Sequence, residues 1–281
     1  MRTSRMKGRL QRVLASLFAV VLSTAIAACA TKQAKEIVAP LPDAPLLLPP
    51  PAIGGPGAAA NDTKTLERID ALIATNPGPT TVASLHIRQA VIYLDQKQYN
   101  RAQAAFESAD AAKLVSPRDQ ALKAVSQDLV WWFRTAPLAT IPDAEMGRAQ
   151  AVMQALKVQI AKRQDSPEIR DYLAEMRAWV GLKYVAALTS RSRQKAAMED
   201  TIDEYATIFT PADLAYLCKP SSAGDNPPLE TQRRRLRAEP VIKQAAKYAS
   251  ELTGPNRPTF REPVMQDLIA PASPNPACTG K

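Results

Sequence analysis

Residues 83–110, ASLHIRQAVIYLDQKQYNRAQAAFESAD, decide the predicted fold of this chain of 281 residues. Their periodicity predicts one helix over 80–96 and a second over 98–115. Small residues let two antiparallel helices approach closely, and aromatic residues fill the cleft above them. These positions are Ala90 and Tyr93 in the first helix and Tyr99, Ala102, Phe106 and Ala109 in the second. The stretch therefore predicts an antiparallel helix pair.

This helix pair resembles one unit of the tetratricopeptide-repeat family. It departs from the family pattern at His86, where Trp is common, at Lys97 in place of the turn glycine, and at the closing proline, displaced to Pro117. No second copy of equal quality occurs. Such repeats present a concave helical surface to a peptide or protein. The resemblance implies that the inner face of the first helices contacts a partner through Ile87, Gln89, Ala90 and Tyr93, with Trp132 beyond.

The helical period continues through residues 61–253 at irregular spacing. Asp62 or Thr63 caps a first helix, which the prolines of NPGP at 76–79 end. Ser-Pro pairs begin helices at 116–117, running to before Pro137, and at 166–167. More helices are expected over 143–163, 194–209, 211–218 and 228–252, the last broken or kinked at Pro240. Strand signals are nearly absent. We predict one all-α domain, a right-handed array of antiparallel helix pairs.

The N-terminus has the three parts of a secretory signal peptide. Residues 1–12, MRTSRMKGRLQR, hold five basic and no acidic residues, and the apolar run VLASLFAVVLSTAIAA follows over 13–28. A plain small-x-small cleavage site at Ala28-Cys29-Ala30 would leave Thr31 as the new N-terminus. Alternatively, Ile26-Ala27-Ala28-Cys29 resembles the lipobox of bacterial lipoproteins. That resemblance implies cleavage after residue 28 and lipidation of Cys29. It also implies outer-membrane sorting, because residue 30 is Ala rather than Asp.

Removal of residues 1–28 changes the charge of the protein. The full chain has 36 basic and 27 acidic residues, and the mature chain keeps 31 basic and 27 acidic residues, a balance of +4. A balance of this size is ordinary for a soluble domain and is poor support for nucleic-acid binding. We expect no nucleic-acid partner.

Residues 29–60 are expected to form a lipidated tether. Seven prolines lie between Val38 and Ala60, so the backbone should be extended polyproline II, and three glycines then add a joint. The tether is most simply a spacer that holds the domain away from the membrane. Alternatively, Leu46-Leu47-Leu48 docks in a groove of a partner.

Residues 254–281 read as a loose, proline-rich tail that a disulfide would pin. Cys218 and Cys278 are the two cysteines left after lipidation of Cys29, and an even pair in an oxidising compartment predicts a disulfide. The chain-entropy model gives roughly 4 kcal/mol for closing a loop of about 60 residues. The alternative is a buried Cys218 and an exposed free thiol at 278.

Recognisable catalytic chemistry is missing from the sequence. His86 is the only histidine, so no histidine pair can bind zinc, and no nucleophile elbow or phosphate loop occurs. We expect no metal, no cofactor and no catalytic residue. Asp200, Asp203 and Glu204 recur at helical spacing, and carboxylate pairs can cleave glycans. These carboxylates leave a glycan-cleaving enzyme without a recognisable motif as an alternative.

Two short runs of sequence, one aromatic and one basic, could bind a partner. Trp131, Trp132 and Phe133 take successive 100° steps around a helix, so one face cannot bury all three equally. We expect two in the core and one partly covered by the next helix, or one as an exposed anchor. Arginines at four positions spread around a second helix and form a solvated face or contact anionic lipid, lipopolysaccharide or an acidic protein. They are Arg233, Arg234, Arg235 and Arg237.

The sequence therefore favours an outer-membrane lipoprotein that presents a periplasm-facing helical scaffold to a protein partner in envelope assembly. The alternatives are a cell-wall glycan enzyme and a structural tether between the outer membrane and peptidoglycan.

Overall fold

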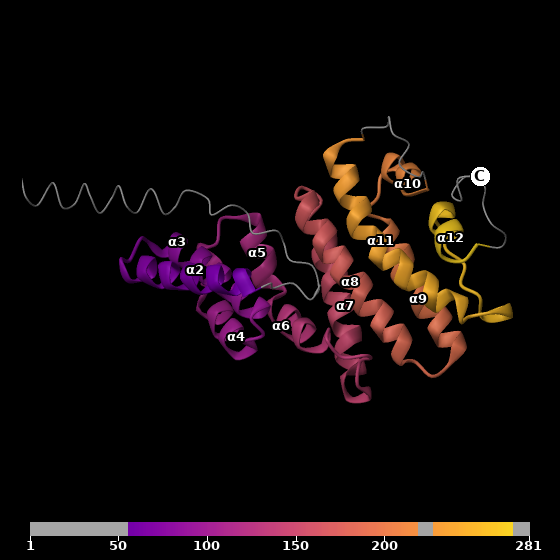
Figure 1. The fold of residues 1–281 in the computed structure, drawn as a ribbon, viewed down its shortest axis with the longest axis horizontal. Helices are drawn as coiled ribbons and strands as arrows, with labels where there is room; N and C mark the ends of the chain where they lie inside the picture. Colours follow the sequence, from indigo (N-terminus) through magenta and orange to yellow (C-terminus); the bar gives the residue numbers. More distant parts are fainter. Residues whose placement is uncertain (1–55, 219–226, 272–281) are drawn as a thin grey trace, which may run out of the picture.

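The computed structural model describes residues 56–218 and 227–271, and for residues 56–62 the backbone alone (Figure 1). Cys29, residues 1–55 and Cys278 lie outside this part of the chain, so the predicted leader, lipid anchor and most of the tether stay predictions. Every regular element in the described ranges is helical, which confirms the all-α prediction there.

The helices follow one another in chain order through the domain. Their bounds are α2 (Pro56–Ala74), α3 (Pro79–Asp95), α4 (Tyr99–Ser108), α5 (Pro117–Ala124), α6 (Ser126–Thr135), α7 (Met146–Ala161), α8 (Pro167–Ala187), α9 (Arg191–Ala206), α10 (Pro211–Cys218), α11 (Leu229–Ser250) and α12 (Pro263–Ile269). Short 3₁₀ turns lie at Ala111–Lys113, Asp143–Glu145 and Gly254–Asn256. In Figure 1, α2–α6 gather at one end of the domain and α9–α12 at the other, with α7 and α8 between them.

Several helix bounds differ from the predicted ones. Helix α2 begins at Pro56 rather than after Asn61, because proline suits the first helical position and three alanines follow. The helix expected over 117–136 is divided at Val125 into α5 and α6. Helix α11 continues through Pro240 without a break. Pro240 and Leu236 are exposed there, so water can hydrogen-bond the carbonyl that the proline leaves free.

Helix α8 is shared by two hydrophobic cores. Ile169, Leu173 and Val180 lie in the first core, with side chains from α3–α7. Leu182 and Val185 lie in the second core, with side chains from α9, α11 and α12. A helix that is buried on all sides lies at the centre of a domain. A third, small cluster of Ile69, Leu72 and Leu85 fastens α2 to α3.

Helices α7 and α9 both pack against α8. Gln150 contacts Tyr184, whereas Met153 contacts Arg177, so α7 and α8 run in opposite directions. On the other side, α8 approaches α9 closely at Gly181. A Cβ atom at this position would lie 2.3 Å from Oγ1 of Thr201. Glycine is therefore required for the spacing of these two helices.

The C-terminal segment was expected to be loose from residue 254, and this expectation is wrong for the part that the structure describes. Phe260, Met265 and Ile269 are buried in the second core, and α12 packs against α11 and α10. The backbone N–H of Arg261 donates a hydrogen bond to Asp203 Oδ1 at 2.8 Å. The prolines of this segment predicted a loop, but it contains the short helix α12. The adjacent helices bury the apolar side chains of α12.

Replacement of Gly181 by Ala is expected to lower the free energy of unfolding by about 1–3 kcal/mol, because the added Cβ overpacks against Thr201. Urea unfolding followed by circular dichroism measures this change. The matched control is Gly147→Ala in α7, where an added Cβ meets nothing within 4 Å. The control should be neutral or about 0.5–1 kcal/mol more stable. Equal stability of Gly181→Ala and the wild type would contradict the close approach of α8 and α9.

Candidate functional site

The residues predicted to form a partner surface on the first helices lie mostly in the interior of the domain. Ile87, Ala90 and Trp132 are buried in the first core. Gln89 is also buried, and its amide donates a hydrogen bond to Asp70 Oδ1 at 2.6 Å. Tyr93 is half-buried against the same core. Packing of α3 against both α2 and α4 turns the expected concave face into an interior one.

The three aromatic residues of α6 divide differently from the prediction. Trp132 is in the core, whereas Trp131 and Phe133 are both half-buried and pack against that core. The indole N–H of Trp131 donates to Glu145 Oε2 at 2.9 Å, and the hydroxyl of Tyr99 donates to the carbonyl of Phe133 at 3.0 Å. One core residue and two partly covered ones leave no fully exposed aromatic anchor on this helix.

The four arginines of α11 do not form a common solvated surface. Arg234 points into the domain, and its side chain is 11 % exposed. Arg237 lies near Glu175, with 3.8 Å between Nε and the carboxylate oxygen. The guanidinium of Arg235 lies 4.9 Å from the ring centroid of Tyr216. Arg233 is the exposed member of the four.

Arg234 joins three helices through buried ion pairs. Its Nε lies 2.6 Å from Asp171 Oδ2 of α8, and Nη1 lies 2.9 Å from Asp213 Oδ2 of α10. Burial raises the pKa of Asp213, but hydrogen bonds from Thr210, Thr231 and Arg234 outweigh that effect and hold the pKa below its ordinary value. Removing one partner of such a pair leaves a buried charge and costs about 3–5 kcal/mol. These arginine contacts are therefore structural.

Glu175 is the least satisfied charged group of this network. Its Oε2 atom is buried and has no hydrogen-bond partner among the described residues. Burial raises the pKa of Glu175 to about 7, against the opposing effects of Arg237 and of a hydrogen bond from Trp179. The carboxyl group therefore titrates near neutral pH inside the protein.

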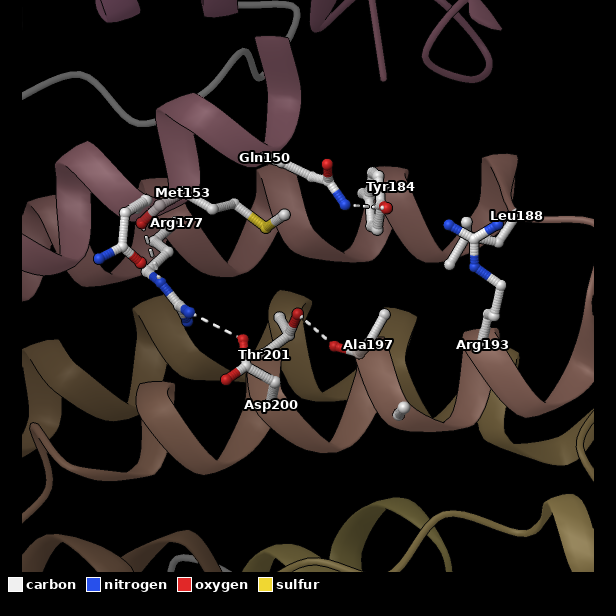
Figure 2. Close-up of a pocket in the computed structure, with 11 residues that line it drawn as sticks. Gln150, Met153, Arg177, Tyr184, Leu188, Arg193, Ala197, Asp200 and Thr201 are labelled. Carbon is white, nitrogen blue, oxygen red and sulfur yellow. Dashed lines mark hydrogen bonds and ion pairs between the residues drawn. The ribbon is translucent and has the colours of Figure 1, made fainter. Parts of the chain in front are cut away.

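A groove of about 400 Å³ opens where α7, α8 and α9 meet (Figure 2). This volume lies in the range of ligand-binding sites. Its walls come from α7 and α9, and α8 forms its floor. The lining side chains are Gln150, Met153, Gln154, Arg177, Tyr184, Leu188, Arg193, Ala196, Ala197, Asp200 and Thr201.

Arg177 fixes the two walls of the groove relative to its floor. The guanidinium donates to the carbonyl of Met153 on α7 at 3.2 Å and to Asp200 Oδ2 on α9 at 2.9 Å. Its side chain is only 6 % exposed. Nearby, the amide of Gln150 donates to the hydroxyl of Tyr184 at 2.5 Å. Figure 2 draws the Gln150–Tyr184 contact between α7 and α8 and the Arg177–Asp200 contact between α8 and α9.

The carboxylates that left a glycan enzyme open do not converge on this groove. Asp200 lines it and pairs with Arg177, whereas Asp203 pairs with Arg261 at 3.1 Å and Glu204 pairs with Lys157 at 2.6 Å. Each therefore stabilises the contact of α9 with a different segment. This arrangement differs from the facing carboxylate pair that glycoside hydrolysis requires.

Apart from Asp200, the groove residues were missed at the level of sequence. Arg177 is one of several charged residues of α8, so the sequence alone does not distinguish it from its neighbours. Arg193 and Gln154 lie in polar stretches without a distinguishing pattern. Their role depends on which helix faces meet, so only the tertiary arrangement brings them together.

Within residues 56–218 and 227–271, no three His, Cys, Asp or Glu side chains are placed to hold a metal ion. No helix there is both long and apolar enough to cross a bilayer. Cys218 lies half-buried at the end of α10, and its predicted pairing with Cys278 involves a residue beyond the described ranges.

Comparison of the chain with protein-family models, curated proteins and solved structures gave no match. Function is therefore inferred from the residues of the groove and of the N-terminus, since a fold alone can serve many functions.

Glu175→Gln is expected to stabilise the protein more at pH 8 than at pH 5. In the folded state the Glu175 carboxyl keeps its proton up to about pH 7, whereas in the unfolded state it loses the proton near pH 4.5. The free energy of unfolding of the wild type therefore falls as the pH rises from about 4.5 to 7. Glutamine does not titrate. The advantage of the variant in the free energy of unfolding should therefore grow by about 2–3 kcal/mol between pH 5 and pH 8.

Urea titrations at both pH values measure the difference, and exposed Glu239→Gln on α11 is the matched control. The control should show no such pH dependence. An advantage of Glu175→Gln that stays constant with pH would contradict the burial of an ionisable Glu175.

Proposed function

We propose that this chain is a bacterial lipoprotein, anchored to the outer membrane through Cys29, whose periplasm-facing helical domain binds a protein partner in envelope assembly. The observation that carries the anchoring is the order of residues 1–29: five basic residues, a short apolar run, and Ile26-Ala27-Ala28-Cys29. Several acyl chains hold a protein stably on a bilayer. A proline-rich segment then separates the anchor from the domain.

The arrangement of the domain supports binding rather than catalysis. Charged groups in the interior pair with one another between helices, as Arg234 does with Asp171 and Asp213. The groove between α7 and α9 combines donors with apolar walls and has no facing carboxylate pair. Helix pairs α3–α4 and α7–α8 pack in succession along the chain, which suits a tetratricopeptide-like array. In that array the partner surface is the α7–α9 groove instead of the face of α3.

A disulfide between Cys218 and Cys278 belongs to the same proposal. Helix α12 packs against α10, at whose end Cys218 lies. Cys278 follows Pro271 by seven residues, which can span up to ~23 Å. The bond would pin the C-terminal segment to the second core in an oxidising compartment. Thiol counting on the denatured, unreduced protein tests it: two free thiols would refute the bond.

Cys29→Ser is expected to abolish incorporation of an alkyne-palmitate label in bacterial cells and to release the protein from the membrane fraction. The lipid is attached through the thiol that serine lacks. Cys278→Ser is the matched control and should keep both the label and the membrane association. A wild-type mature chain that begins at Thr31 and carries no label would overturn the anchor.

The binding role is tested in the same cells by chemical crosslinking of detergent-solubilised envelopes, followed by pull-down of the wild-type chain. A stable protein complex is expected. Absence of any complex, together with turnover of a glycan by the purified chain, would contradict the scaffold and support the enzyme alternative.

A further inference from the structure

The α7–α9 groove presents hydrogen-bonding groups that the domain itself does not use. Within residues 56–218 and 227–271, neither Arg193 nor Gln154 has a hydrogen-bond or ion-pair partner, and both side chains are exposed in the groove lining. Arg193 lies on α9 and Gln154 on α7, so the two groups belong to opposite walls of the groove. An arginine offers five N–H donors, and an amide offers two more.

Donors exceed free acceptors along the groove. The hydroxyl of Tyr184 accepts a hydrogen bond from Gln150 and keeps its own proton for donation. Asp200 is the one carboxylate in the lining, and Arg177 engages its Oδ2 atom at 2.9 Å. A ligand that satisfies this surface must therefore bring acceptors, and a carboxylate is the acceptor that suits the fork of Arg193 best.

The distribution of charge along α9 indicates that the carboxylate of the ligand binds at one end of the groove. In the second half of the helix, Asp200, Asp203 and Glu204 each have a cationic partner. In the first turns, Arg191 donates only to the neutral amide of Gln194, and Arg193 has no anionic partner in the described ranges. Uncompensated positive charge thus gathers at the end of the groove nearest the start of α9.

The spacing of the α7 wall favours an extended chain over a compact anion. Gln150 and Gln154 are four residues apart, so they lie on one face about 5–6 Å from each other. Alternate residues of an extended peptide are about 6.6 Å apart. The two amides can therefore hydrogen-bond successive exposed peptide groups. On the opposite wall, Ala196 and Ala197 are small and leave room for the peptide side chains.

We propose that the α7–α9 groove binds an extended peptide segment of a partner, with an acidic side chain of that segment held by Arg193 and its backbone held by Gln150 and Gln154. This inference rests on the proposed function and specifies the chemistry of the partner and the place where it binds.

The test is selection of a phage-displayed library of random nonapeptides on the full chain, purified in detergent. Aspartate and glutamate should be enriched in the selected peptides. A selected peptide, synthesised with fluorescein, is then titrated by fluorescence anisotropy. Arg193→Gln should raise its Kd at least about tenfold, because a charge-assisted contact is lost. Exposed Arg233→Gln on α11 is the matched control and should leave the Kd unchanged.

Replacing the acidic residue of the peptide by its amide should weaken binding to the wild type but not to Arg193→Gln. Selection without acidic enrichment, equal Kd values for Arg193→Gln and Arg233→Gln, or equal competition by free acetate would overturn the proposal. A crosslinked envelope complex that survives Arg193→Gln would reject the groove and keep the scaffold function. Absence of that complex for the wild type would instead reject the scaffold function.

Discussion

The rest of the structure depends on the burial of α8 along most of its length, from Asp171 to Val185. Its apolar side chains serve two cores, and it also carries charged residues that lie deep in the domain. A buried charge is tolerated only when a partner meets it. Asp171 is met by Arg234 of α11, Arg177 by Asp200 of α9, and Glu175 by Arg237 at the longer distance of 3.8 Å. These requirements fix which helices surround α8 and at which residues they contact it.

The groove is a consequence of the same constraint. Arg177 reaches outward from the central helix, binding the Met153 carbonyl on one neighbour and Asp200 on the other. Gly181 lets α9 approach α8 near Thr201. The walls are therefore held by interior contacts, and Arg193 and Gln154 at the surface remain available for a ligand. A site preorganised in this way loses little entropy when it binds.

Much of the fold could be predicted from the sequence, because helical periodicity and Ser-Pro starts are local signals. The Ser166–Pro167 start and the starts of α3 and α4 lie where those signals place them, whereas α4 ends at Ser108 rather than near residue 115. The face of each helix that stays exposed was not predictable. The sequence pattern around Ala90 is the same whether Ala90 lines a concave binding surface or lies in a core. Ala90 lies in the core because α2 and α4 both pack against α3. Arg234 likewise has the sequence pattern of a surface residue, and only the tertiary structure shows that it is buried against Asp171 and Asp213. The proposed anchor at Cys29 rests on a local sequence pattern alone.

The central claim, that α8 joins both cores into one cooperative unit, is tested most directly by native-state hydrogen exchange at increasing urea, read by mass spectrometry. Amides of α6 in the first core, of α8, and of α11 in the second core should converge on one free energy of opening, because neither core can lose its shared helix and persist. Exchange of α11 through a separate, lower-energy opening, with α6 and α8 still protected, would contradict the account.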